Sequence, residues 1–380
     1  MHTVWIFSLE PIETRYTAQW YEGVPRQIAA FAEKRGTPAR VFMDASEFAA
    51  SDIASGALNI VNIPGDGRPQ KASVGAFLNF ATTNLWKNDQ VNRFIGLIGA
   101  GLVRDGDKVW VADAWHSGIF QLAYMRDLLG IKFEISALWH AGSYDPWDFL
   151  GRNIVDKKWS YATEQALFAT IDRNYFASTF HWSLFNTALG IETNLGDKAV
   201  LSGHPCDYLW DELPRYSIPP DKRPNLILFP HRLAPEKQLE IFKDLAGTLP
   251  QYEWVVCQEQ FLTKPQYHEM LGRAKLSFSA ALQETLGIAQ GEAIIAGAIP
   301  LSPDRLSYTE QYDRPFLYPS EWTESWDAYL AHKSELVTVI VKLIDEYATP
   351  KVQQAIKDQD RVLKARFLTA EPLYRNLVGS

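Results

Sequence analysis

The sequence contains only two cysteines, Cys206 and Cys257, among its 380 residues. A disulfide framework is therefore excluded, and a reducing compartment, the cytoplasm, is expected for this chain. The chain also lacks any run of 18 apolar residues, so no membrane-spanning helix is predicted. Its start, Met1–Trp5, has no basic segment and is interpreted as the beginning of a strand, not as a signal peptide.

Positive charge is scarce, with 37 Lys and Arg against 45 Asp and Glu and a formal net charge of −8. This balance does not indicate a general nucleic-acid binder. The histidines and cysteines show no metal-ligand spacing, so no metal site is predicted. One segment, residues 67–104, departs from the overall balance because it holds five basic residues against the single acid Asp89. Local basic surfaces therefore remain open.

Short β-branched and apolar runs alternate with helical patterns, which predicts an α/β protein with parallel sheets. The first series of predicted strands is Val4–Leu9, Arg40–Met43, Leu58–Ile63, Lys108–Ala112, Glu134–Trp139 and Tyr175–Ser178. The second series is Asn225–Phe229, Glu253–Cys257, Lys275–Ser279 and Ile299–Ser302. The helices predicted between them include Ser73–Leu85, Gly118–Leu129, Tyr161–Ile171, Pro235–Ala246, Pro265–Gly272 and Leu286–Ala296.

The two series are separated by a proline-rich stretch, residues 209–224, which lacks periodicity and is interpreted as a linker. We therefore predict an N-terminal Rossmann-like domain at 1–208 and a C-terminal one at 225–360. Residues 361–380 are predicted to form a helix that packs back on the N-terminal domain. Two such domains leave a cleft at the carboxyl ends of their strands, where ligands of α/β sheets collect.

The most informative stretch is Leu276–Leu301, because it combines two acidic residues with a predicted helix start. Glu284 lies in a loop after a strand, and Glu292 follows eight residues later on the helix predicted from Leu286. A helix start presents unpaired N–H groups and partial positive charge, which favour an anion. The pattern indicates a diphosphate between two polyhydroxyl groups, as in a nucleotide sugar. A solvated helix face remains the alternative for Glu292.

Two basic residues follow the first strand of the second half, in the segment Phe229–Lys237. Proline is favoured in the first turn of a helix, so a helix is predicted from Pro235. Arg232 and Lys237 are then expected at the carboxyl end of the strand, where two cations can neutralise a departing diphosphate. Ordinary surface solvation is the alternative for either residue alone.

These two segments resemble retaining glycosyltransferases of the GT-B fold over roughly residues 225–303. Arg232 and Lys237 match the R-x-x-x-x-K loop of that family, and Glu284 and Glu292 match its E-x7-E signature. The segment Glu292–Pro300 resembles the EA-x-x-x-G-x-P continuation, with two residues instead of one between Gly297 and Pro300. The resemblance implies an α/β fold of two Rossmann-like domains that face each other across a cleft.

The resemblance also implies a role for each matching residue. Arg232 and Lys237 would bind the donor diphosphate. Glu284 would hold the transferred sugar as a catalytic residue, and Glu292 would bind the ribose hydroxyls. The helix start would complete the donor site with Leu286 and Gly287. Thr-Leu follows Glu284 where the family commonly has a small residue and an aromatic one, which leaves the identity of the sugar open.

The first half offers candidates for the acceptor side. His140 follows a predicted strand in the segment Ala137–Asp145 and resembles the histidine that the family carries near the reacting sugar. It is the second catalytic candidate, and a histidine that only caps the strand end is the alternative. Asp113, at another strand end, and Asp145, in a turn, are candidates for binding the acceptor.

The segment after the first predicted strand, Ser8–Tyr21, is interpreted as a loop that carries Glu10, Arg15 and Tyr16 where the family commonly has glycines. These side chains are expected to recognise an acceptor. Together with residues 139–145, the segment looks similar to glycosyltransferases carried by bacteriophages, a set linked to sugar addition on hydroxymethylated pyrimidines. Double-stranded DNA is therefore a candidate partner, and a basic face is predicted from Arg68, Lys71, Lys87 and Arg93.

The resemblance implies transfer with retention from a nucleotide-diphosphate donor, most commonly a UDP-sugar. No cofactor or metal is expected, because Arg232 and Lys237 can stabilise the leaving diphosphate. Three alternatives stay open. The acceptor can be a small metabolite or a glycan, the chain can be a non-catalytic nucleotide-sugar-binding or DNA-binding protein, or it can be an epimerase that acts on the donor.

Overall fold

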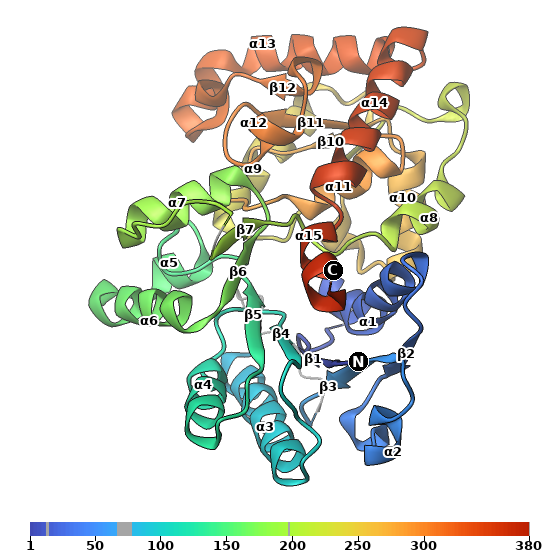
Figure 1. The fold of residues 1–380 in the computed structure, drawn as a ribbon. Helices are drawn as coiled ribbons and strands as arrows, with labels where there is room; N and C mark the ends of the chain where they lie inside the picture. The colour runs from blue at the N-terminus through green and yellow to red at the C-terminus, as the bar shows by residue number, and fades with distance from the viewer. Residues whose placement is uncertain (13–14, 67–77, 197, 380) are drawn as a thin grey trace. The chain divides into compact units, whose positions relative to one another are not determined.

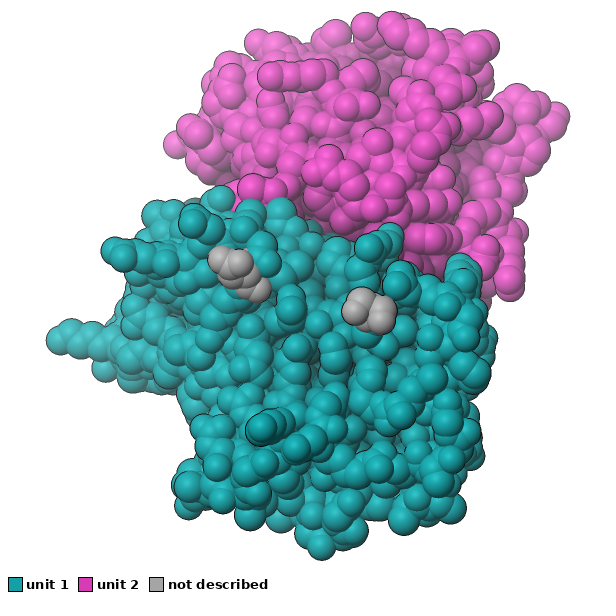
Figure 2. Space-filling model, viewed as in Figure 1, with its two compact units in different colours: residues 1–177, 182–205, 370–380 teal, residues 178–181, 206–369 magenta. Residues whose placement is uncertain are grey.

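The computed structural model describes residues 1–12, 15–66, 78–196 and 198–379 and divides into two compact units (Figure 1, Figure 2). Unit 1 comprises 1–177, 182–205 and 370–380, and unit 2 comprises 178–181 and 206–369. Each unit is built on its own parallel sheet. Among the described residues, no helix combines the length and the apolarity that a membrane crossing requires.

Over the described residues, the sheet of unit 1 has seven strands in the order β2-β3-β1-β4-β5-β6-β7. Every pair is parallel, with Val4 opposite Ile60 on one side of β1 and opposite Lys108 on the other. The central strands are apolar and buried on both faces, as expected for a parallel sheet covered by helices. The strands are β1 Thr3–Phe7, β2 Ala39–Phe42, β3 Leu58–Ile63, β4 Lys108–Val111, β5 Glu134–Leu138, β6 Arg173–Phe176 and β7 Ala199–Leu201.

Helices cover both faces of this sheet (Figure 1). α1 leads from β1 toward the β2 edge, whereas α3, α4 and α6 lead toward the β7 edge. Because parallel crossovers are right-handed, these two directions require opposite faces. The helices are α1 Tyr16–Lys34, α2 Ala50–Ile53, α3 Phe80–Gly99, α4 Gly118–Leu129, α5 Phe149–Asn153, α6 Lys157–Thr170 and α15 Glu371–Val378, with α7 Thr179–Leu189 carrying residues of both units.

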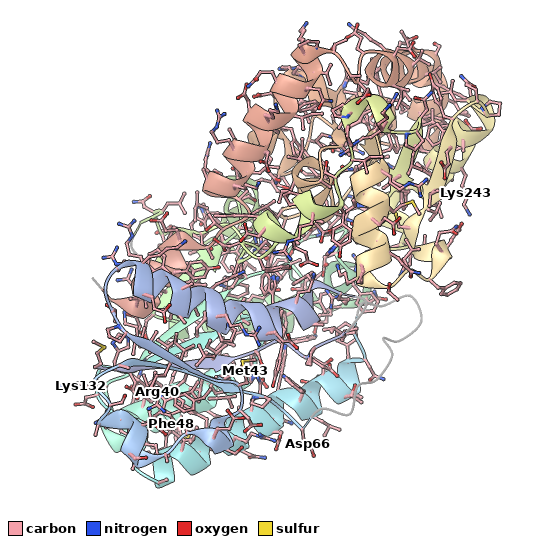
Figure 3. The ribbon with its side chains drawn as sticks, turned by 90° about the vertical axis from the view of Figure 1, so that its right-hand side faces the viewer. Arg40, Met43, Phe48, Asp66, Lys132 and Lys243 are labelled. Carbon is pink, nitrogen blue, oxygen red and sulfur yellow. The ribbon has the colours of Figure 1, made fainter. Side chains whose placement is uncertain are left out.

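An aromatic cluster forms much of the unit 1 core. The ring of Phe48, labelled in Figure 3, lies edge-on to Trp5 with 5.2 Å between ring centroids. Phe94 on α3 contacts Trp5 from another direction. On β2, the edge strand of the sheet, Arg40 (labelled in Figure 3) pairs with Asp52 at 2.8 Å.

Unit 2 is built on five parallel strands in the order β12-β11-β10-β8-β9. Lys243, labelled on α9 in Figure 3, pairs with Glu259 at 2.8 Å. The strands are β8 Leu226–Phe229, β9 Glu253–Val256, β10 Leu276–Phe278, β11 Ile299–Pro303 and β12 Leu317–Tyr318. The helices are α8 Leu209–Glu212, α9 Leu239–Thr248, α10 Lys264–Arg273, α11 Ile288–Ile295, α12 Tyr308–Gln311, α13 Trp326–Asp345 and α14 Pro350–Arg366.

Two expected segments differ in the structure. The predicted loop Ser8–Tyr21 ends early, because α1 begins at Tyr16 and buries Thr17, Trp20 and Val24 at helical spacing. The helix predicted over Ser73–Leu85 was wrong in extent. α3 begins at Phe80, after Asn79 accepts a hydrogen bond from the Thr82 N–H as N-cap, and part of the predicted range lies outside the described residues.

The ends of the second half are also informative. The stretch 209–224 contains α8 and short 3₁₀ turns, and it belongs to unit 2 with Leu209 and Leu213 buried. α14 belongs to unit 2, whereas α15 belongs to unit 1. There the hydroxyl of Tyr374 donates to Gln27 Oε1 on α1 at 2.8 Å.

Candidate active site

In unit 2, charged residues gather on the loops that follow β8 and β10, which are neighbours in the sheet. After β8 the chain forms a 3₁₀ turn at Pro235–Lys237, and α9 begins only at Leu239. The helix predicted from Pro235 was therefore placed too early, because Gln238 takes a left-handed φ of 52°. The Gln238 amide donates to the carbonyls of Ala280 and Thr323, which ties the two loops together.

The two loops meet in an ion pair. Lys237 Nζ lies 2.7 Å from Glu284 Oε1, and it also donates to the carbonyl of Gln283. The Lys237 side chain is 4% exposed and that of Glu284 is 18% exposed, so water screens the pair only weakly. Arg232, on the same loop as Lys237, pairs with Glu236 at 2.5 Å and keeps 32% of its side chain exposed. The cluster thus presents one buried and one accessible cation.

A buried histidine completes this cluster. His231 Nδ1 lies 3.6 Å from Glu284 Oε1. Burial lowers the pKa of His231 to about 4 in spite of the neighbouring Glu284, so the imidazole is neutral at pH 7. Burial acts to raise the pKa of Glu284, but Lys237, with His231 and Arg232, outweighs it and holds that pKa below its ordinary value. Glu284 is therefore an anion at neutral pH.

The start of α11 lies directly after Glu284. Its N-cap, Gly287, has a φ of +80°, and a Cβ at this position would lie 2.7 Å from Cε1 of Tyr308. Leu286 is buried, and its carbonyl accepts from the Gln311 amide at 2.6 Å. The helix start is thereby fixed, and its first N–H groups have no acceptor within the helix.

Glu292 lies on α11, on the same helix whose start follows Glu284. Its side chain is 5% exposed, and its Oε2 accepts a hydrogen bond from the Tyr267 hydroxyl at 2.8 Å. The ammonium of Lys264 lies 3.8 Å from Oε1. Both partners come from α10, so Glu292 is held by a neighbouring element of the same unit.

In unit 1, His140 lies after β5 and is held at both ring nitrogens. Nε2 lies 2.8 Å from the carbonyl of Ala112, and Nδ1 lies 3.2 Å from the hydroxyl of Tyr16. A carbonyl only accepts, so Nε2 carries the proton and Nδ1 accepts from Tyr16. Burial lowers the pKa of His140, which keeps the ring neutral. Trp20 and His204 pack on the same ring, at centroid distances of 5.6 and 5.3 Å.

Asp113 follows β4 and pairs with Lys87 of α3 at 2.8 Å. Burial acts to raise the pKa of Asp113, but Lys87 outweighs it and lowers that pKa to about 2. Lys87 also donates to the carbonyl of Trp115. Asp113 is therefore engaged in linking α3 to the loop after β4.

The remaining acceptor candidates have local partners. Glu10 is buried and accepts from the Thr83 hydroxyl at 2.7 Å. Asp145 is buried and accepts from the backbone N–H of Trp147 at 3.0 Å. The guanidinium of Arg15 lies 5.4 Å from the centroid of the Tyr16 ring.

No family model and no curated protein matches the sequence, whereas solved structures do. A sucrose-phosphate synthase from Thermosynechococcus elongatus matches with a TM-score of 0.60 at 12% identity, covering 99% of both chains. HepE from Anabaena, solved with UDP and glucose, matches with a TM-score of 0.55 at 12% identity over 100% of both chains. A glycosyltransferase from Rickettsia africae ESF-5 matches with a TM-score of 0.54 at 13% identity, covering 100% of this chain and 99% of its own. The chain spans 60% of the matched chain in a GtfA/B complex.

The chain has the GT-B glycosyltransferase fold. The α/β class with two parallel sheets, expected from the strand and helix patterns, is thereby confirmed. Within unit 2 of this GT-B chain, Lys237 and Glu284 adjoin each other, and Glu292 lies on the helix that begins four residues after Glu284. Within unit 1, His140 adjoins Tyr16.

The predicted basic face is not formed by the residues that the structure describes. Lys87 is 12% exposed and paired with Asp113, and Arg93 pairs with Asp44 at 3.2 Å and with Asp89 at 3.1 Å. Carboxylates from α3 itself and from other parts of unit 1 thus neutralise both cations. The other two members of the predicted face, Arg68 and Lys71, lie outside the described residues.

Three residues of these clusters were not predicted from the sequence: His231, Tyr267 and His204. His231 adjoins Arg232, so its position in the basic loop was a usable signal. Lys87 was predicted as part of the basic face, not as the partner of Asp113. Tyr267 and His204 are distant in sequence from the motifs, and only the fold brings them to Glu292 and His140.

Proposed function

We propose that the protein is a retaining glycosyltransferase that moves a sugar from a UDP-sugar to an acceptor hydroxyl. The observation that carries the proposal is the Lys237–Glu284 ion pair beside the start of α11, with Glu292 on that helix. A buried ion pair contributes little net stability, so its position on two loops at strand ends favours a functional role. HepE, a structure of the same fold, was solved with UDP and glucose, which supports the choice of donor.

In the proposed reaction, the bond between the anomeric carbon and the diphosphate oxygen breaks, and a bond to the acceptor oxygen forms on the same face of the sugar. The acceptor proton passes to the departing diphosphate oxygen. Lys237, Arg232 and the start of α11 stabilise the charge that develops on the diphosphate. Glu284, ionised at neutral pH, accepts hydrogen bonds from sugar hydroxyls, and Glu292 accepts them from the ribose.

For unit 1 we propose that the neutral His140 ring, held by Tyr16 and by the Ala112 carbonyl, contacts the substrate. His140 Nδ1 accepts from Tyr16. A shift of the Tyr16 hydroxyl would release this nitrogen to accept from a substrate hydroxyl. Glu10, Asp113 and Asp145 have partners within unit 1, as Arg15 and Tyr16 do, and all five are proposed as candidates for contact with an acceptor.

As the acceptor we propose hydroxymethylated pyrimidines in double-stranded DNA, on the resemblance of residues 8–21 and 139–145 to phage-borne enzymes. The test is to incubate the protein with a panel of nucleotide sugars and hydroxymethylated DNA, digest the DNA and weigh the nucleosides by mass spectrometry. A nucleoside heavier by one sugar is expected. Unmodified DNA of the same sequence is the matched control and should remain unchanged.

The same assay separates the other candidates. Release of UDP without a DNA product, but with transfer to an added glycan or metabolite, would assign a different acceptor. An isomerised donor would indicate an epimerase. Binding of donor without any turnover would indicate a non-catalytic nucleotide-sugar-binding protein and would overturn the enzyme proposal.

A further inference from the structure

The carboxylate of Glu292 is held asymmetrically. Oε2 accepts a hydrogen bond from the Tyr267 hydroxyl at 2.8 Å, and in the part of the chain that the structure describes Oε1 accepts none. The nearest cation to Oε1, Lys264 Nζ, lies 3.8 Å away, beyond hydrogen-bond distance. The Glu292 side chain keeps 5% of its surface exposed. One oxygen is occupied by the protein and the other is available.

Tyr267 can only act as the donor in this contact. A carboxylate accepts and does not donate, so the phenol O–H points at Oε2. Burial, reinforced by Glu292, raises the pKa of Tyr267 well above its ordinary value, so the proton stays on the phenol. A charge-assisted bond of this kind restrains the Glu292 side chain, which would otherwise sample several rotamers.

Helix α10 is itself well anchored, so Tyr267 is a rigid support. Its first turn is capped by Thr263, whose N–H donates to Gln266 Oε1 at 2.9 Å. At the next position after Tyr267, His268 is buried with Nδ1 2.9 Å from Glu212 of α8. The ammonium of Lys264 lies 5.1 Å from the Tyr267 ring centroid, which adds a cation–π contact on one face.

We infer that Tyr267 is the positioning residue that presents Glu292 Oε1 to the adjacent hydroxyls of the donor ribose. The inference rests on the proposed function and deepens it, because it names a residue that sets selectivity for ribonucleotides over deoxyribonucleotides. A fixed carboxylate oxygen accepts from both ribose hydroxyls, and losing the 2′-hydroxyl removes one of these bonds. A carboxylate that turns freely discriminates less, because orienting it costs rotamer entropy on binding.

The experiment measures binding of UDP and of 2′-deoxy-UDP by calorimetry for the wild type and for Tyr267→Phe. The wild type is expected to prefer UDP by about tenfold, the value of one good hydrogen bond. In Tyr267→Phe, UDP should bind about tenfold more weakly and the preference should fall toward one. In a Glu292→Ala background, adding Tyr267→Phe should have no further effect on either ligand.

The matched control is Tyr329→Phe. Tyr329 also donates its hydroxyl to a carboxylate of unit 2, Asp244 Oδ2 at 2.6 Å, but between α13 and α9. The Tyr329→Phe variant should leave the affinities for UDP and 2′-deoxy-UDP unchanged. Should Tyr267→Phe fail to fold, Glu292→Asp tests the same contact, because the shorter carboxylate withdraws from the phenol, and it should lose the UDP preference.

Two results would overturn the inference and leave the proposed function standing. In the first, Tyr267→Phe binds both nucleotides with wild-type affinity. In the second, its affinities for UDP and 2′-deoxy-UDP fall by the same factor, which indicates a merely structural role. A wild type that binds neither nucleotide would overturn the proposed donor and the inference together.

Discussion

Burying the Lys237–Glu284 ion pair costs free energy, and such a pair contributes little to the stability of the fold. Removing two charges from water costs several kcal/mol, and replacing such pairs by apolar residues is often neutral or stabilising. The pair persists here on two loops of neighbouring strands, with the neutral His231 against the same carboxylate. An incoming diphosphate offers Lys237 an alternative anion, which would release Glu284 for a sugar.

We expect Glu284→Ala to abolish turnover while the protein stays folded. The substitution removes the carboxylate that would hold the transferred sugar, and loss of a comparable transition-state contact costs roughly 10²–10³ in rate. Initial rates of UDP release, with thermal melting as the check on folding, measure the effect. Glu284→Gln is the matched control for stability, because its amide oxygen still accepts from Lys237. A variant that retains wild-type turnover would remove Glu284 from the mechanism.

Asp113 is expected to contribute measurably to stability at neutral pH and to lose this contribution in acid. Its pKa in the folded chain is about 2, below the ordinary 3.8, because Lys87 outweighs the effect of burial. A depressed pKa stabilises the fold fully above the ordinary value, and this contribution is lost as pH falls through about 2. The difference corresponds to ~2 kcal/mol.

The measurement is urea unfolding of the wild type and Asp113→Asn at pH 6 and at pH 2.5. The variant should be less stable at pH 6, where it leaves Lys87 buried without its carboxylate. The difference in unfolding free energy between the wild type and the variant should be smaller at pH 2.5. A gap that is constant across this range would show that the Asp113–Lys87 pair does not titrate as inferred.

The residues proposed for the donor site could be grouped from the sequence, because their spacing reflects a local strand–loop–helix geometry. Arg232, Lys237 and Glu284 lie within loops and turns that follow individual strands, and Glu292 lies on the helix that follows Glu284. The contacts of the unit 1 candidates were harder to predict from the sequence. The role of Lys87 depends on the approach of α3 to the loop after β4, and no local pattern specifies which carboxylate a lysine will meet.

At the scale of elements, the start of α11 depends on one glycine. Gly287 has a φ of +80°, a region that side-chain-bearing residues adopt only at a cost of about 1–2 kcal/mol. A Cβ there would also lie 2.7 Å from the buried Tyr308 ring. Both effects act on the turn that leads from Glu284 into the helix.

We expect Gly287→Ala to lower the free energy of unfolding by roughly 2 kcal/mol and to weaken UDP binding. Chemical denaturation and calorimetry measure the two effects. The matched control is Gly247→Ala in α9 of the same unit, where an added Cβ meets nothing within 4 Å. That variant should gain about 0.5–1 kcal/mol from the higher helix propensity of alanine. Equal changes in unfolding free energy and in UDP affinity in the two variants would contradict the role assigned to Gly287.

Element boundaries were predicted less well than element types. α1 begins inside a segment interpreted as a loop. Its buried positions, Thr17, Trp20 and Val24, stand among polar and aromatic residues, so the apolar helix face is hard to recognise in the sequence. α9 begins after Pro235–Lys237 because tertiary hydrogen bonds from the Gln238 amide stabilise a left-handed backbone. Neither feature has a strong local signal.

At the scale of the whole molecule, turnover is expected to be independent of divalent metal. In the proposed donor site, Lys237, Arg232 and the start of α11 would supply the positive charge that a metal would otherwise bring to the diphosphate. Initial rates with excess EDTA and with added Mg²⁺ or Mn²⁺ should agree within about twofold. A strong loss in EDTA that Mn²⁺ restores would contradict this expectation.

The sequence by itself determined the alternation of strands and helices, the doubling of the α/β pattern and the motif residues of the second half, because periodicity, caps and short spacings are local properties. Only the tertiary structure decided the strand orders, the membership of α15 in unit 1, and the partners of Glu292, His140 and Lys87. These depend on contacts between segments far apart in the chain. Burial then set which carboxylates remain charged and which histidines stay neutral, since a pKa responds to desolvation and neighbouring charge, not to sequence position.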